Sequence, residues 1–113
     1  MNDYTIGVVG LGNMGLPIAE NLVNNGFPVT AYDIDPTRRS PNVALDYCDN
    51  LGEIVAKTAR LLFSLPDYAA VLGVTEELSR IAGAHPLEIL DTSTIGPTGC
   101  ERIAQLLAGT NIT

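Results

Sequence analysis

Short apolar runs alternate with stretches of helical period along most of the chain. The first run, Ile6–Gly10, ends in glycines, as expected of a buried strand that leads into a tight turn. Apolar residues then recur at spacings of three and four up to Asn25-Gly26, a pair typical of a helix C-terminus. The predicted apolar face of this helix comprises Met14, Ile18, Ala19, Leu22 and Val23.

The same alternation continues to the end of the sequence. Further strands are predicted at Val29–Asp33, Leu61–Leu65 and Leu87–Leu90, with a short one around Ala44–Tyr47. Helices are predicted over Leu51–Thr58, from Asp67 to near Gly83 with a stripe of Val71, Val74, Leu78 and Ile81, and around Cys100, Ile103 and Leu107. Pro41 should interrupt any helix that begins at Pro36, so an irregular segment is expected there.

This β-α-β alternation predicts the fold class. It indicates an α/β protein of Rossmann type, a doubly wound parallel sheet with right-handed crossovers and helices on both faces, in three α/β/α layers. The 113 residues are enough for one domain with a core and too few for two. Aromatic residues make up only 5% of the chain, so the core must come from Val, Ile, Leu and Ala, as in parallel sheets covered by helices.

Charge and composition exclude several classes of partner. The formal net charge of −7 argues against nucleic acid and against an anionic membrane, because both need a basic face. Residues Met1–Thr5 lack the pattern of a signal peptide, and no apolar run approaches the length of a membrane span. Cys48 and Cys100 match no metal or redox spacing. We therefore expect a cytoplasmic protein without a metal site.

The segment after the first strand carries the strongest chemical signal. Gly10-Leu11-Gly12-Asn13-Met14-Gly15 fits the pattern G-x-G-x-x-G, and Asp33 ends the next predicted strand, 21 residues after Gly12. In such a motif, Gly10 permits the turn, Gly12 lets the backbone approach a pyrophosphate, and Gly15 lets the helix pack against the sheet. Backbone N–H groups and the positive end of the helix dipole then face the phosphates. The constellation predicts a dinucleotide site.

Asp33 bears on which dinucleotide is bound. A carboxylate at this position accepts hydrogen bonds from the adenosine ribose and repels the additional 2′-phosphate of NADP, so we expect NAD. Arg38 and Arg39 lie close enough in sequence to soften that preference, and NADP stays open as an alternative. The competing interpretation is structural: the glycines would serve only a tight turn, and Asp33 would only end a strand.

Three motifs together resemble the β-hydroxyacid dehydrogenases, a family that includes 3-hydroxyisobutyrate dehydrogenase and tartronate semialdehyde reductase and, more distantly, 6-phosphogluconate dehydrogenase. The glycine segment, extended through Leu16-Pro17-Ile18-Ala19-Glu20-Asn21-Leu22, is similar to the family's N-terminal signature. Leu65-Pro66 sits where the family has Leu-Pro after the fourth strand. Asp91-Thr92-Ser93-Thr94-Ile95-Gly96-Pro97 is similar to its D-x-S-T-x-x-P segment.

The resemblance implies further contacts with the cofactor. Leu65-Pro66 and Ser93-Thr94 would flank its nicotinamide half, in agreement with the rule that open α/β sheets bind ligands at the carboxyl ends of their strands. The alternative for Ser93 and Thr94 is an ordinary polar loop that caps the last helix.

The resemblance also implies that the family's chain continues beyond this sequence. The family's substrate-binding D-A-P-V-S-G-G segment and the helical domain with its catalytic lysine have no counterpart here, so residues 1–113 are interpreted as the NAD(P)-binding domain, ending before a sixth strand. No catalytic residue is predicted. Lys57, the chain's single lysine, is interpreted as a solvated surface residue.

The implied function belongs to the parent enzyme, which would transfer a hydride between a small β-hydroxyacid and the nicotinamide. The fragment by itself should bind the cofactor without significant turnover. Three alternatives stay open: a 6-phosphogluconate dehydrogenase-like enzyme, a stand-alone non-catalytic dinucleotide-binding module, and an interaction fragment that forms homo-oligomers through an open sheet edge near residues 87–91.

Overall fold

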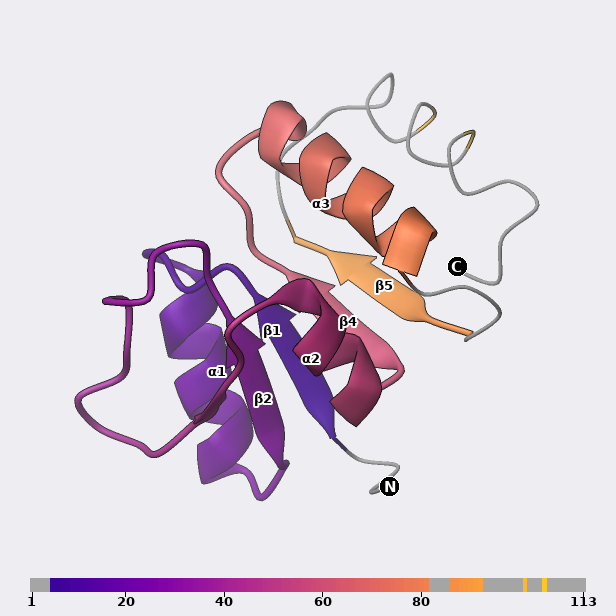
Figure 1. The fold of residues 1–113 in the computed structure, drawn as a ribbon. Helices are drawn as coiled ribbons and strands as arrows, with labels where there is room; N and C mark the ends of the chain where they lie inside the picture. The colour runs from indigo at the N-terminus through magenta and orange to yellow at the C-terminus, as the bar shows by residue number, and fades with distance from the viewer. Residues whose placement is uncertain (1–4, 82–85, 93–100, 102–104, 106–113) are drawn as a thin grey trace.

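The computed structural model describes residues 5–81, 86–92, 101 and 105. Within these residues, five strands form one parallel sheet in the order β3-β2-β1-β4-β5. Figure 1 shows β2, β1, β4 and β5 side by side in this order. The strands are β1 (Ile6–Val9), β2 (Val29–Tyr32), β3 (Asp46–Tyr47), β4 (Arg60–Phe63) and β5 (Glu88–Asp91). Strand order turns back at β1, since β2 lies on one side of it and β4 on the other. Open α/β sheets bind ligands at such a switch point.

Helices cover both faces of this sheet. They are α1 (Gly15–Asn24), α2 (Leu51–Lys57) and α3 (Tyr68–Ile81). Successive strand residues point to opposite faces, and β1 accordingly sends Val8 to one hydrophobic cluster and Val9 to the other. The Val8 cluster includes Ala19 of α1, and the Val9 cluster includes Ile54 of α2 and Leu78 of α3. The predicted α/β architecture, with helices on both faces, is confirmed.

Side chains of the neighbouring loops fix where two of the helices begin. Asn50 accepts a hydrogen bond from the backbone N–H of Glu53, whose carboxylate in turn accepts one from the N–H of Asp49, so the first turn of α2 is capped from both sides. Asp67 caps α3 by accepting a bond from the N–H of Ala70. The sequence-based start of this helix at Asp67 is therefore confirmed.

Two described residues of the predicted apolar faces, Met14 and Ile81, are exposed to solvent. Met14 is 64% exposed because it precedes the first helical residue of α1 and belongs to the glycine loop. Ile81 is 42% exposed at the last turn of α3, whereas Thr75 is fully buried in the same helix. The helical spacing of apolar residues predicted that both side chains would be buried. This spacing predicts burial only for residues within a helix and on the part of it that packs against the sheet.

The segment between β2 and β3 contains no helix, as Pro41 led us to expect, and residues 33–45 form turns and irregular backbone. The predicted last helix lies outside the described residues, apart from positions 101 and 105, which are helical. No helix within the described part of the chain combines the length and apolar character that a membrane crossing requires.

Candidate functional site

The glycine loop lies directly after β1, at the carboxyl edge of the sheet. Gly10 has a φ of +100°, a conformation that favours glycine, and a side chain there would meet the backbone of Ser64. A methyl group on Gly15 would overlap the carbonyl oxygen of Gly10. Both glycines are therefore required by the close approach of α1 and β4 to this turn.

The amino end of α1 opens on the outer side of the same loop. Its N-cap residue, Met14, makes no capping hydrogen bond through its side chain, and the first turn carries no acidic residue. A Cβ built on Gly12 would meet only the Arg38 guanidinium, at 3.5 Å, so the outer face of the loop is otherwise open. An uncapped helix start with an approachable backbone suits a bound phosphate.

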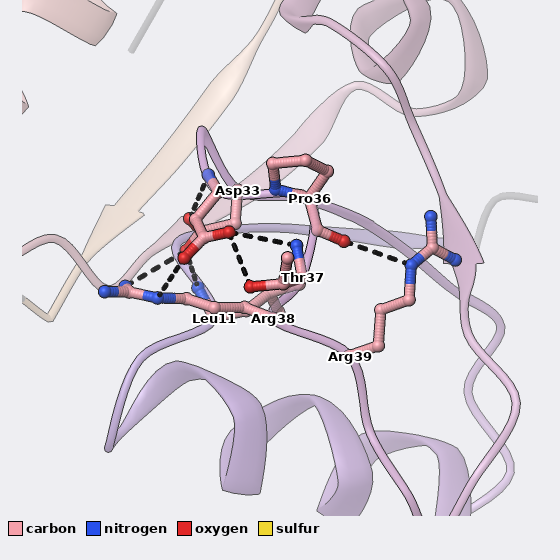
Figure 2. Close-up of polar contacts among 7 residues, drawn as sticks. Leu11, Asp33, Pro36, Thr37, Arg38 and Arg39 are labelled. Carbon is pink, nitrogen blue, oxygen red and sulfur yellow. Dashed lines mark hydrogen bonds and ion pairs between the residues drawn. The ribbon is translucent and has the colours of Figure 1, made fainter.

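Asp33 joins the glycine loop to the end of β2. Its Oδ2 accepts a 2.7 Å hydrogen bond from the backbone N–H of Leu11, and its Oδ1 accepts one of 2.8 Å from the N–H of Asp35 (Figure 2). The Asp33 side chain is only 6% exposed. The sequence-based pairing of the glycine motif with this aspartate is thus realised as a direct contact across 22 residues.

Two arginines follow Asp33 on the irregular segment. The Arg38 Nη1 atom lies 3.5 Å from Asp33 Oδ2, and its Nε lies 3.7 Å from Asp35 Oδ2. The Arg39 side chain points away from Asp33, and its Nε donates a hydrogen bond to the carbonyl of Pro36 (Figure 2). Its guanidinium carbon lies 4.2 Å from the centre of the Tyr47 ring. The two guanidinium groups therefore have different partners.

These residues surround a small pocket of about 130 Å³. Its walls come from the ends of β2 and β3, the glycine loop and the segment after Asp33. The lining residues are Leu11, Ala31, Tyr32, Asp33, Ile34, Asp35, Pro36, Arg38, Arg39, Tyr47, Cys48 and Asp49. Ile34 is 89% exposed, so its apolar side chain is available to a ligand.

Two ionisable side chains that line the pocket, Asp35 and Tyr32, have pKa values shifted from their ordinary values. Hydrogen bonds donated by the hydroxyl and the backbone of Thr37, together with the charge of Arg38, lower the pKa of Asp35 below its ordinary value. Burial, together with the negative charges of Glu77 and Asp33, raises the pKa of Tyr32, so its phenol stays neutral at physiological pH. In the described residues, no group of three or more His, Cys, Asp or Glu side chains is placed to hold a metal ion.

The other predicted contacts lie at the carboxyl ends of β4 and β5. The Leu65 side chain comes within 3.2 Å of the position that a Cβ on Gly10 would take, so the Leu65-Pro66 loop adjoins the glycine loop. Both the backbone N–H and the hydroxyl of Thr92 donate to the carbonyl of Phe63, which joins the loop after β5 to the end of β4. Ser93 and Thr94 themselves lie outside the described residues.

The sequence analysis missed several lining residues. Ile34 and Tyr47 follow or end short strands, and the rule that parallel strands bind ligands at their carboxyl ends was the signal that could have identified them. Lys57, interpreted as a solvated residue, is exposed but paired: its Nζ lies 2.8 Å from Asp46 Oδ2. That contact raises the pKa of Lys57.

Known proteins resemble this chain in sequence and in fold. The chain is 28% identical over 109 residues to mitochondrial 3-hydroxyisobutyrate dehydrogenase of Mus musculus, covering 88% of this chain and 31% of the mouse protein. The solved structure of 3-hydroxyisobutyrate dehydrogenase from Mycobacterium tuberculosis with L-serine superposes with a TM-score of 0.84 at 28% identity, covering 98% of this chain and 38% of that one.

A second solved structure, imine reductase from Pseudomonas sp., has a TM-score of 0.85 at 25% identity and matches 98% of this chain and 39% of its own. The chain thus spans less than two-fifths of the length of these relatives. The family model for the NAD-binding domain of 6-phosphogluconate dehydrogenase matches residues 5–113, a range that contains the glycine loop, Asp33 and the whole parallel sheet. The chain therefore belongs to the family of the 6-phosphogluconate dehydrogenase NAD-binding domain.

Proposed function

We propose that residues 10–15 bind the pyrophosphate of a nicotinamide dinucleotide and that the pocket beside Asp33 holds its adenosine half. The observation that carries the proposal is the Leu11–Asp33 hydrogen bond, which brings the glycine loop and the carboxylate to one edge of the sheet. The uncapped start of α1 lies on the same side. Leu65 and Pro66, together with Ser93 and Thr94, are proposed to contact the nicotinamide half.

We propose NAD rather than NADP as the preferred cofactor. The Asp33 carboxylate is fixed by two backbone donors, so it would oppose a 2′-phosphate placed beside it. Arg38, 3.5 Å from that carboxylate, offsets part of the repulsion and should leave measurable NADP binding.

The protein that contains this domain is proposed to be an oxidoreductase acting on a small β-hydroxyacid of the 3-hydroxyisobutyrate type. The names of the relatives support that substrate class. The nicotinamide supplies the hydride chemistry when bound, and this chain's residues bind and orient it. Because this chain spans less than two-fifths of the relatives' length, the proton-transfer and substrate-binding groups are proposed to lie in a further domain, and residues 1–113 are proposed to be inactive by themselves.

Two measurements test these proposals. Calorimetric titration of the chain with NADH and NADPH should show saturable binding that favours NADH; binding of neither would contradict the cofactor site. Full-length protein should then reduce NAD⁺ with 3-hydroxyisobutyrate, while the 113-residue chain should not. Turnover of 6-phosphogluconate with release of CO₂ would instead identify the decarboxylating alternative.

A further inference from the structure

The irregular segment between β2 and β3 is fastened to helix α1 by one serine. The Ser40 hydroxyl donates a 2.5 Å hydrogen bond to Glu20 Oε2, and its oxygen accepts bonds of 3.1 Å from the backbone N–H groups of Asn42 and Val43. The Asn42 side-chain amide donates a further 3.1 Å bond to the same Glu20 oxygen. Glu20 therefore binds the segment at two points.

Tyr47 fastens the same stretch from the other side. The Tyr47 hydroxyl oxygen accepts a 2.7 Å hydrogen bond from the backbone N–H of Ser40, and the guanidinium of Arg39 stacks on the Tyr47 ring. The ring is itself partly buried against the hydrophobic cluster that contains Ala19 of α1. Ser40 is thus held between a helix and the end of β3.

The contacts of Ser40 with Glu20 and Tyr47 directly follow the two pocket arginines in the sequence. Arg38 and Arg39 precede Ser40 in the chain, and both line the pocket, whereas Glu20 does not. No helix or strand orders residues 33–45, so side-chain hydrogen bonds must supply the order that regular backbone pairing supplies elsewhere. A loop released at Ser40 would leave the two guanidinium groups held only by their own contacts, with Asp33 and Asp35 for Arg38 and with Pro36 and Tyr47 for Arg39.

We propose that Glu20 is a positioning residue for the adenosine half of the bound dinucleotide. Glu20 acts through Ser40 and the loop, which keep Arg38 and Arg39 at the pocket wall before the ligand arrives. Binding then costs less conformational entropy, because these two side chains are already ordered. This inference rests on the proposed dinucleotide site. It assigns Glu20 no contact with the ligand and no part in the nicotinamide half.

The test compares Glu20→Ala, Glu20→Gln and Ser40→Ala with wild type, with Asn21→Ala as the control for an exposed change on the same helix. Each protein is titrated with NADH, with 5′-AMP as a probe of the adenosine half, and with reduced nicotinamide mononucleotide as a probe of the other half. Thermal unfolding of each variant is measured in parallel.

Glu20→Ala and Ser40→Ala should each weaken NADH and 5′-AMP by about five- to tenfold, the size expected when one or two hydrogen bonds are lost. Their effects should be less than additive in the Glu20→Ala/Ser40→Ala double variant, because both remove the Ser40–Glu20 hydrogen bond. Glu20→Gln keeps an acceptor oxygen and should stay within about twofold of wild type, as should Asn21→Ala. Binding of the nicotinamide probe should not change.

Several outcomes would overturn the inference. Unchanged 5′-AMP affinity in Glu20→Ala is one, and an equal loss for both half-cofactors together with a lower Tm, which marks a purely structural role, is another. Glu20→Gln as weak as Glu20→Ala would exclude the hydrogen bond as the cause. Wild-type protein that binds neither NADH nor 5′-AMP would instead overturn the proposed function, and this inference with it.

Discussion

The backbone N–H of Leu11 donates a 2.7 Å hydrogen bond to the carboxylate of Asp33, and this contact ties the glycine loop to the second strand. The aspartate thereby has two roles. It shapes the glycine turn through the hydrogen bond to Leu11, and its charge is proposed to face the adenosine ribose. Substitutions at Asp33 should separate these roles.

Asp33→Ala should cost about 1–3 kcal/mol in the free energy of unfolding, because the N–H groups of Leu11 and Asp35 lose their acceptor. Asp33→Asn keeps one acceptor oxygen and should cost less, yet it removes the charge. Both variants should lose the preference for NADH over NADPH. Urea denaturation measures the first effect and calorimetric titration the second; a retained preference in Asp33→Asn would contradict the role of the charge.

Arg38→Ala should weaken NADPH much more than NADH, by about tenfold against about threefold or less, since a 2′-phosphate would gain a charged partner that a ribose hydroxyl does not need. The NADPH affinity of wild type should also fall more steeply with salt. Arg60→Ala is the matched control: it removes an exposed arginine of β4 that lies near Glu88 of β5. Equal losses for both dinucleotides would count against this role.

Two helical glycines, Gly15 at the start of α1 and Gly73 within α3, should respond in opposite ways to the same substitution. Gly15→Ala places a methyl group on the carbonyl of Gly10 and should abolish dinucleotide binding or folding. Gly73 lies within α3, and a methyl group added there would have nothing within 4 Å, so Gly73→Ala should stabilise the protein by about 0.5–1 kcal/mol. Circular dichroism melts of the two variants test this contrast.

The Asp35 pKa gives a pH dependence whose sign is fixed. Bonds from Thr37 lower this pKa in the folded state, so the ionised carboxylate contributes stability above its ordinary pKa, and that contribution disappears as the pH falls through the lowered value. Asp35→Asn should therefore differ from wild type at neutral pH and begin to converge with it below about pH 3.8. Unfolding curves from neutral to strongly acidic pH measure this; a constant difference would contradict it.

Most of the fold was predictable from local pattern. The apolar runs at Ile6–Val9 and Val29–Tyr32 became adjacent parallel strands, and Asp67 capped the helix that follows it. Such features depend on residues close in sequence, where side-chain period and capping chemistry act directly. Met14 departed from the prediction because it belongs to the turn before α1, where the helical period does not apply.

The sequence by itself determined the β-α-β order, the glycine turn and the candidate carboxylate, because each follows from short-range geometry and spacing. Only the tertiary structure decided the wall of the pocket. Residues 33–45 carry no period, so their path depends on contacts such as that of Ser40 with Glu20, which lies 20 residues away in the sequence and comes close only because α1 packs on the sheet. The contacts of Arg38 with Asp33 and Asp35 are local, within five residues, but the pocket that Arg38 lines also includes Leu11 and Tyr47, which only the packing of the sheet brings beside it.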